Sequence, residues 1–167
     1  MKTLKKLFFL VTAVFALGMI VSCSHDSDSS SGNSGVIATY VESEYGITYV
    51  EFHGDNTWVM YMNMGMRNIN DCLLLAVSPE YKGTYSGNPN ADGQITMTTT
   101  HEAGAPSDEE QARVNAFFAS NENLHSDRDI TIQVTVPWEA YTGGNATETL
   151  TITNGEVEVG DKTYVRQ

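Results

Sequence analysis

The segment Thr147-Glu-Thr-Leu-Thr-Ile-Thr-Asn-Gly-Glu-Val-Glu-Val159 decides the fold, because apolar and polar residues alternate in it on both sides of a turn. Asn154-Gly155 between alternating segments is the strongest short hairpin signal, since a type I′ turn needs positive φ at both of its central residues. A two-residue turn brings the apolar residues together on one face of the hairpin. The expected pairs are Ile152 with Val157 and Leu150 with Val159.

The chain continues this pattern to its C-terminus. A second turn near Gly160-Asp161 leads into residues 162–166, which places Tyr164 opposite Val157. The C-terminal segment is therefore predicted to form an antiparallel meander.

Short segments of the same kind recur upstream and are separated by Gly-, Asn- and Asp-containing turns. The predicted strands are residues 36–42, 47–52, 57–62, 81–86, 95–100 and 130–136, and residues 72–77 form an apolar run too short to assign to either a strand or a helix. Eight or nine short strands with few helices predict an all-β fold. We expect an antiparallel up-and-down β-barrel, with a β-sandwich as the alternative.

One helix is predicted within a long connection, near residues 108–120. Ser107 followed by Glu110 is a capping-box pattern, and Val114, Phe117 and Phe118 form an apolar stripe after it. Its place in the chain is typical of a plug or lid over one end of a barrel.

The N-terminus has the layout of a secretory signal peptide. A start containing Lys2, Lys5 and Lys6 precedes an apolar run over residues 7–21, and Ser22 stands directly before Cys23. The run is shorter than the ~20 apolar residues that span a bilayer. Ile20-Val21-Ser22-Cys23 resembles the lipobox of bacterial lipoproteins. The resemblance implies cleavage after Ser22, attachment of diacylglycerol to the Cys23 thiol and a membrane anchor carrying acyl chains such as palmitate.

The predicted domains are a lipoprotein signal peptide over residues 1–22, a lipidated flexible tether over residues 23–35 and a barrel domain over residues 36–167. The tether reads Ser24-His-Asp-Ser-Asp-Ser-Ser-Ser-Gly-Asn-Ser-Gly35 and contains no large apolar residue. Acidic residues soon after a lipidated cysteine resemble a surface-export signal of some diderm bacteria. We therefore expect a cell-envelope protein, anchored in the outer membrane at its periplasmic face or at the cell surface.

Charge and cysteine content restrict the partners and the source of stability. The net charge is −12, and removal of residues 1–22, which hold three of the nine basic residues and no acidic one, leaves six basic against 21 acidic residues. Such a surface repels nucleic acids and anionic lipid headgroups.

With Cys23 lipidated, only Cys72 remains. No internal disulfide is then possible, so a hydrophobic core must stabilise the domain.

Residues throughout the barrel domain resemble the lipocalin-like domains of small bacterial lipoproteins. The resemblance rests on Phe52 followed by Gly54-Asp55-Asn56-Thr57-Trp58, on Gly83-Thr84-Tyr85 leading to Ile95-Thr96-Met97-Thr98, and on Tyr164-Val165-Arg166. It implies a barrel whose interior can hold an apolar ligand. We expect Phe52, Trp58, Met60, Met62 and Tyr85 to face inward and to form the ligand-binding residues.

Met60, Met62, Met64 and Met66 are the most distinctive chemical pattern of the chain. Alternate residues of a strand share one face, so the spacing predicts four thioethers side by side. Methionine in such a place lines a core or an apolar pocket. A soft-metal site for Cu(I) and an exposed interaction loop are the alternatives.

Other patterns favour structural roles. Residues 88–93 copy the first half of an EF-hand loop but are expected to form a hairpin turn, because the closing acidic ligand is missing. No motif joins Cys72 to His101 as a catalytic pair. We therefore expect no enzyme, metal or cofactor.

The predicted function is binding of a small apolar or amphipathic ligand, and the alternative is an envelope or surface interaction module with a filled barrel and an unknown protein partner.

Overall fold

The computed structural model describes residues 35–44, 48–70, 72–122 and 129–167. The predicted signal peptide, Cys23 and all of the tether except Gly35 lie outside the described residues. The predictions made for those segments remain predictions.

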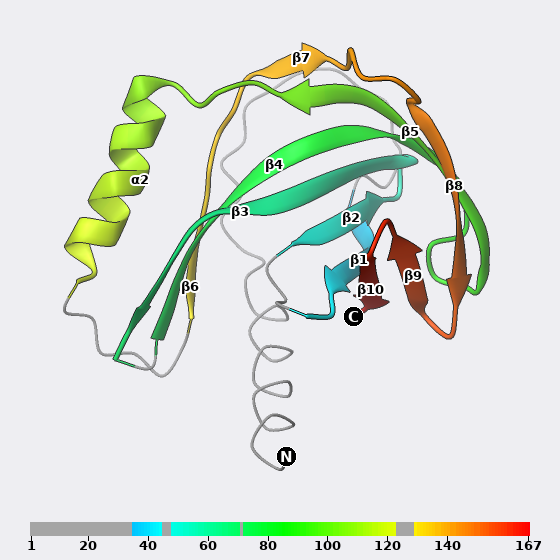
Figure 1. The fold of residues 1–167 in the computed structure, drawn as a ribbon, viewed down its shortest axis with the longest axis horizontal. Helices are drawn as coiled ribbons and strands as arrows, with labels where there is room; N and C mark the ends of the chain where they lie inside the picture. Colours follow the sequence, from blue (N-terminus) through cyan, green and yellow to red (C-terminus); the bar gives the residue numbers. More distant parts are fainter. Residues whose placement is uncertain (1–34, 45–47, 71, 123–128) are drawn as a thin grey trace. The chain divides into compact units, whose positions relative to one another are not determined.

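The described residues form strands and one helix, shown in Figure 1. The elements in chain order are β1 (Val36–Glu42), β2 (Tyr49–His53), β3 (Thr57–Ile69), β4 (Cys72–Gly87), β5 (Gly93–Ala103), α2 (Asp108–Ser120), β6 (Ile130–Gln133), β7 (Trp138–Ala140), β8 (Thr147–Thr153), β9 (Glu156–Val159) and β10 (Lys162–Arg166). The prediction of an all-β fold with one short helix is confirmed.

Eight strands pair in a circuit that returns to its start. The antiparallel neighbours run β1, β2, β3, β4, β5, β8, β9, β10 and back to β1. Only the segment with α2, β6 and β7 interrupts this chain order. Strand β6 pairs in parallel with β4, and β7 pairs with β5 outside the circuit. The arrangement is the predicted up-and-down barrel.

The two strands of the C-terminal hairpin, β8 and β9, pair next to their turn and separate beyond it. Asn154 and Gly155 have φ values of 55° and 75°, as a type I′ turn requires. The predicted pairs of Val157 with Ile152 and with Tyr164 are confirmed. The predicted pair of Leu150 with Val159 is wrong, because the β8–β9 ladder contains only the two residue pairs next to the turn. The two strands separate beyond these pairs (Figure 1).

Strands β3 and β4 are longer than predicted. They pair from Thr57–Thr84 as far as Ile69–Cys72, so the apolar run over residues 72–77 is part of a strand. The far half of this hairpin carries a second cluster of buried residues, in which Ala76 packs with Val114 of α2 and with Val134. Phe118 of α2 packs against the same cluster.

The helix begins as predicted. The Ser107 hydroxyl accepts a hydrogen bond from the Glu110 N–H at 3.2 Å. The Glu110 carboxylate does not return to the cap but accepts from the Arg113 side chain at 2.6 and 2.7 Å and from the Thr135 N–H at 2.6 Å. The bond from Thr135 fastens α2 to the chain after β6. The prediction of a lid over the barrel is wrong, because α2 packs on the β3–β4 hairpin instead.

Several turns meet at one end of the barrel, which we call the closed end. Gly35 enters there and accepts a hydrogen bond from the Gly54 N–H at 3.0 Å. The Asp92 carboxylate accepts from the N–H groups of Asn154 and Gly155 at 2.7 and 3.0 Å. The turn between β4 and β5 thus uses its acidic residue to hold the neighbouring turn. The hairpin interpretation of residues 88–93 is confirmed.

Candidate functional site

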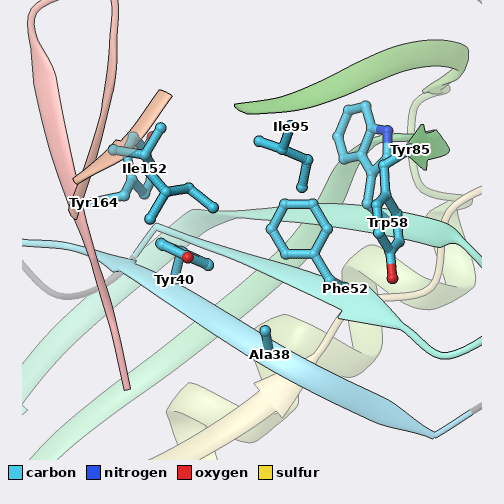
Figure 2. Close-up of a cluster of buried hydrophobic side chains, with 9 residues drawn as sticks. Ala38, Tyr40, Phe52, Trp58, Tyr85, Ile95, Ile152 and Tyr164 are labelled. Carbon is cyan, nitrogen blue, oxygen red and sulfur yellow. The ribbon is translucent and has the colours of Figure 1, made fainter. Parts of the chain in front are cut away.

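Inward-facing aromatic side chains occupy the centre of the barrel (Figure 2). The ring of Phe52 meets Tyr40 edge-on at 5.8 Å and Tyr85 edge-on at 5.0 Å between centroids. Ile95 and Ile152, from β5 and β8, belong to the same buried cluster. Alternation along each strand brings these residues together, since every second residue faces inward.

A cavity of about 280 Å³ lies beside this cluster. Alternate residues of β5 (Ile95, Met97) and of β8 (Leu150, Ile152) form one wall. Val159 of β9 also lines it, where β8 and β9 have separated. The barrel is therefore not filled by its own side chains. The space lies at the lower limit of the ~300–1,000 Å³ that ligand pockets occupy.

Six aromatic rings line the cavity, and we call them the aromatic lining. They are Tyr40, Phe52, Trp58, Tyr81, Tyr141 and Tyr164. Aromatic rings offer apolar contact area together with an electron-rich face. The cavity can therefore hold an apolar group, and its walls also suit a positively charged one.

Polar groups gather at the end of the cavity away from the closed end, which we call the mouth. Thr99, Asn145 and Glu148 line it there, and Asn145 and Glu148 are exposed to solvent. Tyr81 and Tyr141 lie beside each other at the mouth with their rings edge-on at 6.2 Å. Among the described residues, Glu148 is the one acidic side chain in the lining, and no lysine, arginine or histidine contributes to it.

Hydrogen bonds fix the polar atoms of the aromatic residues. The Tyr40 hydroxyl donates to the Pro89 carbonyl at 2.8 Å, and the Tyr85 hydroxyl donates to the His53 carbonyl at 2.9 Å. The Trp58 Nε1–H donates to the Thr84 carbonyl at 3.1 Å. Burial raises the pKa of both tyrosines, so they stay neutral at physiological pH. The rings are thus held in place before any ligand arrives.

Arg166 lies at the closed end, where its backbone N–H donates to the Gly155 carbonyl at 2.8 Å. Burial raises the pKa of the Tyr40 hydroxyl. The Arg166 side chain interacts with this hydroxyl and offsets part of that rise. Hydrogen bonds from the backbone N–H groups of Asn154 and Gly155 lower the pKa of Asp92, and the charge of Arg166 adds a smaller lowering effect. The Arg166 Nη1 atom is buried and has no hydrogen-bond partner among the described residues. Arg166 itself does not line the cavity.

The structure brings together three of the five predicted ligand-binding residues. Phe52, Trp58 and Met60 line the cavity. Tyr85 is buried behind Phe52 and supports the wall without reaching the space. Met62 does not line the cavity and is 36% exposed, so the expectation that it contributes to the interior is wrong.

The prediction of four methionines on one face is also wrong, because β3 contains a bulge. The register shifts between Asn63 and Gly65, and this shift leaves Met64 without a partner on β4. Gly65 lies on the face of β3 that meets Phe118 of α2. Neighbouring residues of a strand point to opposite faces, so Met66 points away from α2. Met64 and Met66 are 43% and 57% exposed, whereas Met60 lines the cavity. The four thioethers are therefore not arranged to share one copper ion.

Sequence reasoning missed the mouth, because none of its residues was among the predicted ligand-binding residues. Continuing the alternation from Ile95 to Thr99 and from Ile152 back to Glu148 would have placed Met97 and Glu148 inside the barrel. Tyr141 had no such signal, since it lies in the loop between β7 and β8. Its ring packs where a Cβ atom at Gly143 would stand, so this loop depends on a small residue there.

The structure does not form the catalytic pair that was considered for Cys72. His101 pairs with Lys82 in the sheet, ten residues along β4 from Cys72, which is about 33 Å at ~3.3 Å per residue. Cys72 is fully buried, and burial raises the pKa of its thiol. The described residues contain no cluster of three or more His, Cys, Asp or Glu side chains that could hold a metal ion.

The described helix is too short and too polar to cross a membrane. No family model, curated protein sequence or solved structure matches the chain closely enough to show a relationship.

Proposed function

We propose that this chain is a membrane-anchored bacterial lipoprotein whose barrel binds a small apolar or amphipathic ligand and performs no catalysis on it. The observation that carries the proposal is the cavity of about 280 Å³ with an apolar wall and a polar mouth. A pocket with mainly apolar lining and a few polar groups at one side is typical of small-molecule binding.

The wall of the cavity supports this function more than a purely structural role. A barrel of eight strands is narrow enough for its own side chains to fill. Here Leu150 and Val159 fail to meet across the β8–β9 seam, and both line the space between them. The hydrogen-bonded rings of Tyr40 and Trp58 are fixed on the other side. A ligand therefore meets a preformed site, which lowers the entropic cost of binding.

The lipid anchor and the location in the cell envelope rest on the Ile20-Val21-Ser22-Cys23 sequence. The test is incorporation of labelled palmitate by the full-length chain and by its Cys23→Ala variant. The unmodified chain should incorporate the label and sediment with membranes, whereas the variant should do neither. Acylation of the Cys23→Ala chain would refute the anchor.

Ligand binding can be measured through Trp58. The lipidated protein is placed in phosphatidylcholine nanodiscs and carries Trp138→Phe, so that Trp58 is the only tryptophan left. Eight-carbon apolar probes should change its fluorescence saturably. Val159→Phe, which fills the cavity, should abolish the change, whereas Val165→Phe on the outer face of β10 should preserve it. The same response in both variants would mean that the probes act from the lipid and not from the cavity.

A second function is favoured by the exposed methionines. Met62, Met64 and Met66 are 36%, 43% and 57% exposed on β3. Methionine adapts to varied partners and is frequent on protein-binding surfaces. A photo-crosslinker at position 66 should then give one discrete adduct in cells, and the same group at position 158 should not. Equal labelling at both positions would remove the support for an interaction module.

A further inference from the structure

The cavity combines features that discriminate between ligands by charge. Its mouth bears a carboxylate, Glu148, and its walls bear the six rings of the aromatic lining. The Glu148 side chain forms neither a hydrogen bond nor an ion pair with any described residue. At neutral pH an unpaired carboxylate beside an apolar space attracts a cation and repels an anion.

The aromatic lining strengthens the same preference. The face of an aromatic ring attracts a cation within about 6 Å of its centroid, and the attraction grows when water is excluded. Tyr81 and Tyr141 stand beside each other at the mouth, and Trp58 lies deeper in the cavity. Cations that enter thus meet ring faces as well as the carboxylate.

The rest of the molecule points in the same direction. The chain carries a net charge of −12, which raises the local concentration of cations around it. Lys162, the basic residue of β10 near the mouth, is already paired with the buried Glu42 carboxylate at 3.0 Å. Arg166 lies at the closed end, behind Tyr40 and close to Asp92. Neither cation lines the cavity to receive an anionic ligand.

We propose that the ligand is a small organic cation, an ammonium-type group on an apolar body, with its charge at Glu148 and its body against the aromatic lining. The inference rests on the proposed ligand-binding function and adds the chemical class of the ligand. Carboxylic acids such as fatty acids are disfavoured by the same geometry.

The test compares octylammonium, octanol and octanoate, three probes with the same alkyl chain. Each is titrated into the lipidated Trp138→Phe protein in phosphatidylcholine nanodiscs, with Trp58 fluorescence as the readout and Val159→Phe as the blank for probe dissolved in lipid. Octylammonium should bind at least about tenfold more tightly than octanol, as a carboxylate and ring faces together allow. Octanoate should bind most weakly.

Two variants separate the cavity carboxylate from the general negative charge. Glu148→Gln should reduce the preference for octylammonium over octanol to about twofold or less. Glu158→Gln removes the same charge from the outer face of β9, and it should keep the full preference. If both variants lose it equally, the preference comes from net charge and the assignment of Glu148 is wrong.

The remaining outcomes are also decisive. Octanol or octanoate binding as tightly as octylammonium would overturn the cationic ligand but leave ligand binding standing. If octanoate binds and Arg166→Gln abolishes that binding, the site receives an anion at the closed end instead. If none of the three probes changes Trp58 fluorescence saturably, the proposed function itself fails.

Discussion

Replacing Ile95 by alanine tests whether the aromatic and aliphatic cluster beside the cavity is the core that holds the barrel together. Ile95 is 2% exposed and packs within that cluster. The substitution removes three carbon atoms, which at ~0.8 kcal/mol each is about 2.4 kcal/mol of lost burial. The void that remains adds a further cost, so the free energy of unfolding should fall by about 3–4 kcal/mol.

The measurement is urea unfolding of the full-length chain at pH 7, and Met66→Ala is the control. Met66 is 57% exposed, so its loss should cost less than about 1 kcal/mol. The slope of the transition should not change, because neither variant alters the surface exposed on unfolding by much. Benzene should partly restore the Ile95→Ala variant, since an apolar void binds small apolar molecules. Equal losses in the two variants would refute the assignment of the core.

Substitutions at three other places test local features. Ser107→Ala should cost about 1 kcal/mol, because it removes the cap of α2, and chemical unfolding would show it. The pKa of Glu110 is lowered from 4.5 to about 2, chiefly by its hydrogen bond with the Arg113 side chain, so its contribution to stability is present above pH 4.5 and is lost as the pH falls toward 2. Unfolding midpoints of Glu110→Gln should therefore fall less between pH 5 and pH 2 than those of the unmodified protein, and an identical pH profile would contradict this. Gly155→Ala should cost about 1–2 kcal/mol at φ 75°, whereas Gly144→Ala, with nothing near its Cβ position, should cost little.

Features determined by neighbouring residues could be predicted from the sequence. Asn154-Gly155 fixes its turn through backbone preferences alone, and the register that it imposes holds for the pairs next to it. The cap of α2 at Ser107 is equally local. The alternating segments between such turns also match barrel strands, as residues 36–42 do for β1 (Val36–Glu42).

Features that depend on distant segments could not be predicted in this way. The bulge at Met64 lies where the far half of β3 meets β4 and Phe118, and the local alternation does not reveal it. The separation of β8 from β9 likewise depends on how the whole circuit closes around the cavity. Alternation alone therefore placed Phe52 and Trp58 at the site but misplaced Met62.

The hydrogen bond from Gly54 to Gly35 fixes the end of the barrel at which the chain enters. A lipid on Cys23, as proposed above, would join the barrel at this closed end through the 12 residues from Ser24 to Gly35, which span at most about 43 Å. The mouth lies at the other end of the barrel from Gly35, so a tether attached there leaves the entrance to the cavity uncovered by its own chain. The backbone N–H of Gln167 donates to the Thr39 carbonyl within the barrel, so an epitope for labelling is better placed in the turn at Gly160-Asp161, at the end of the barrel away from Gly35.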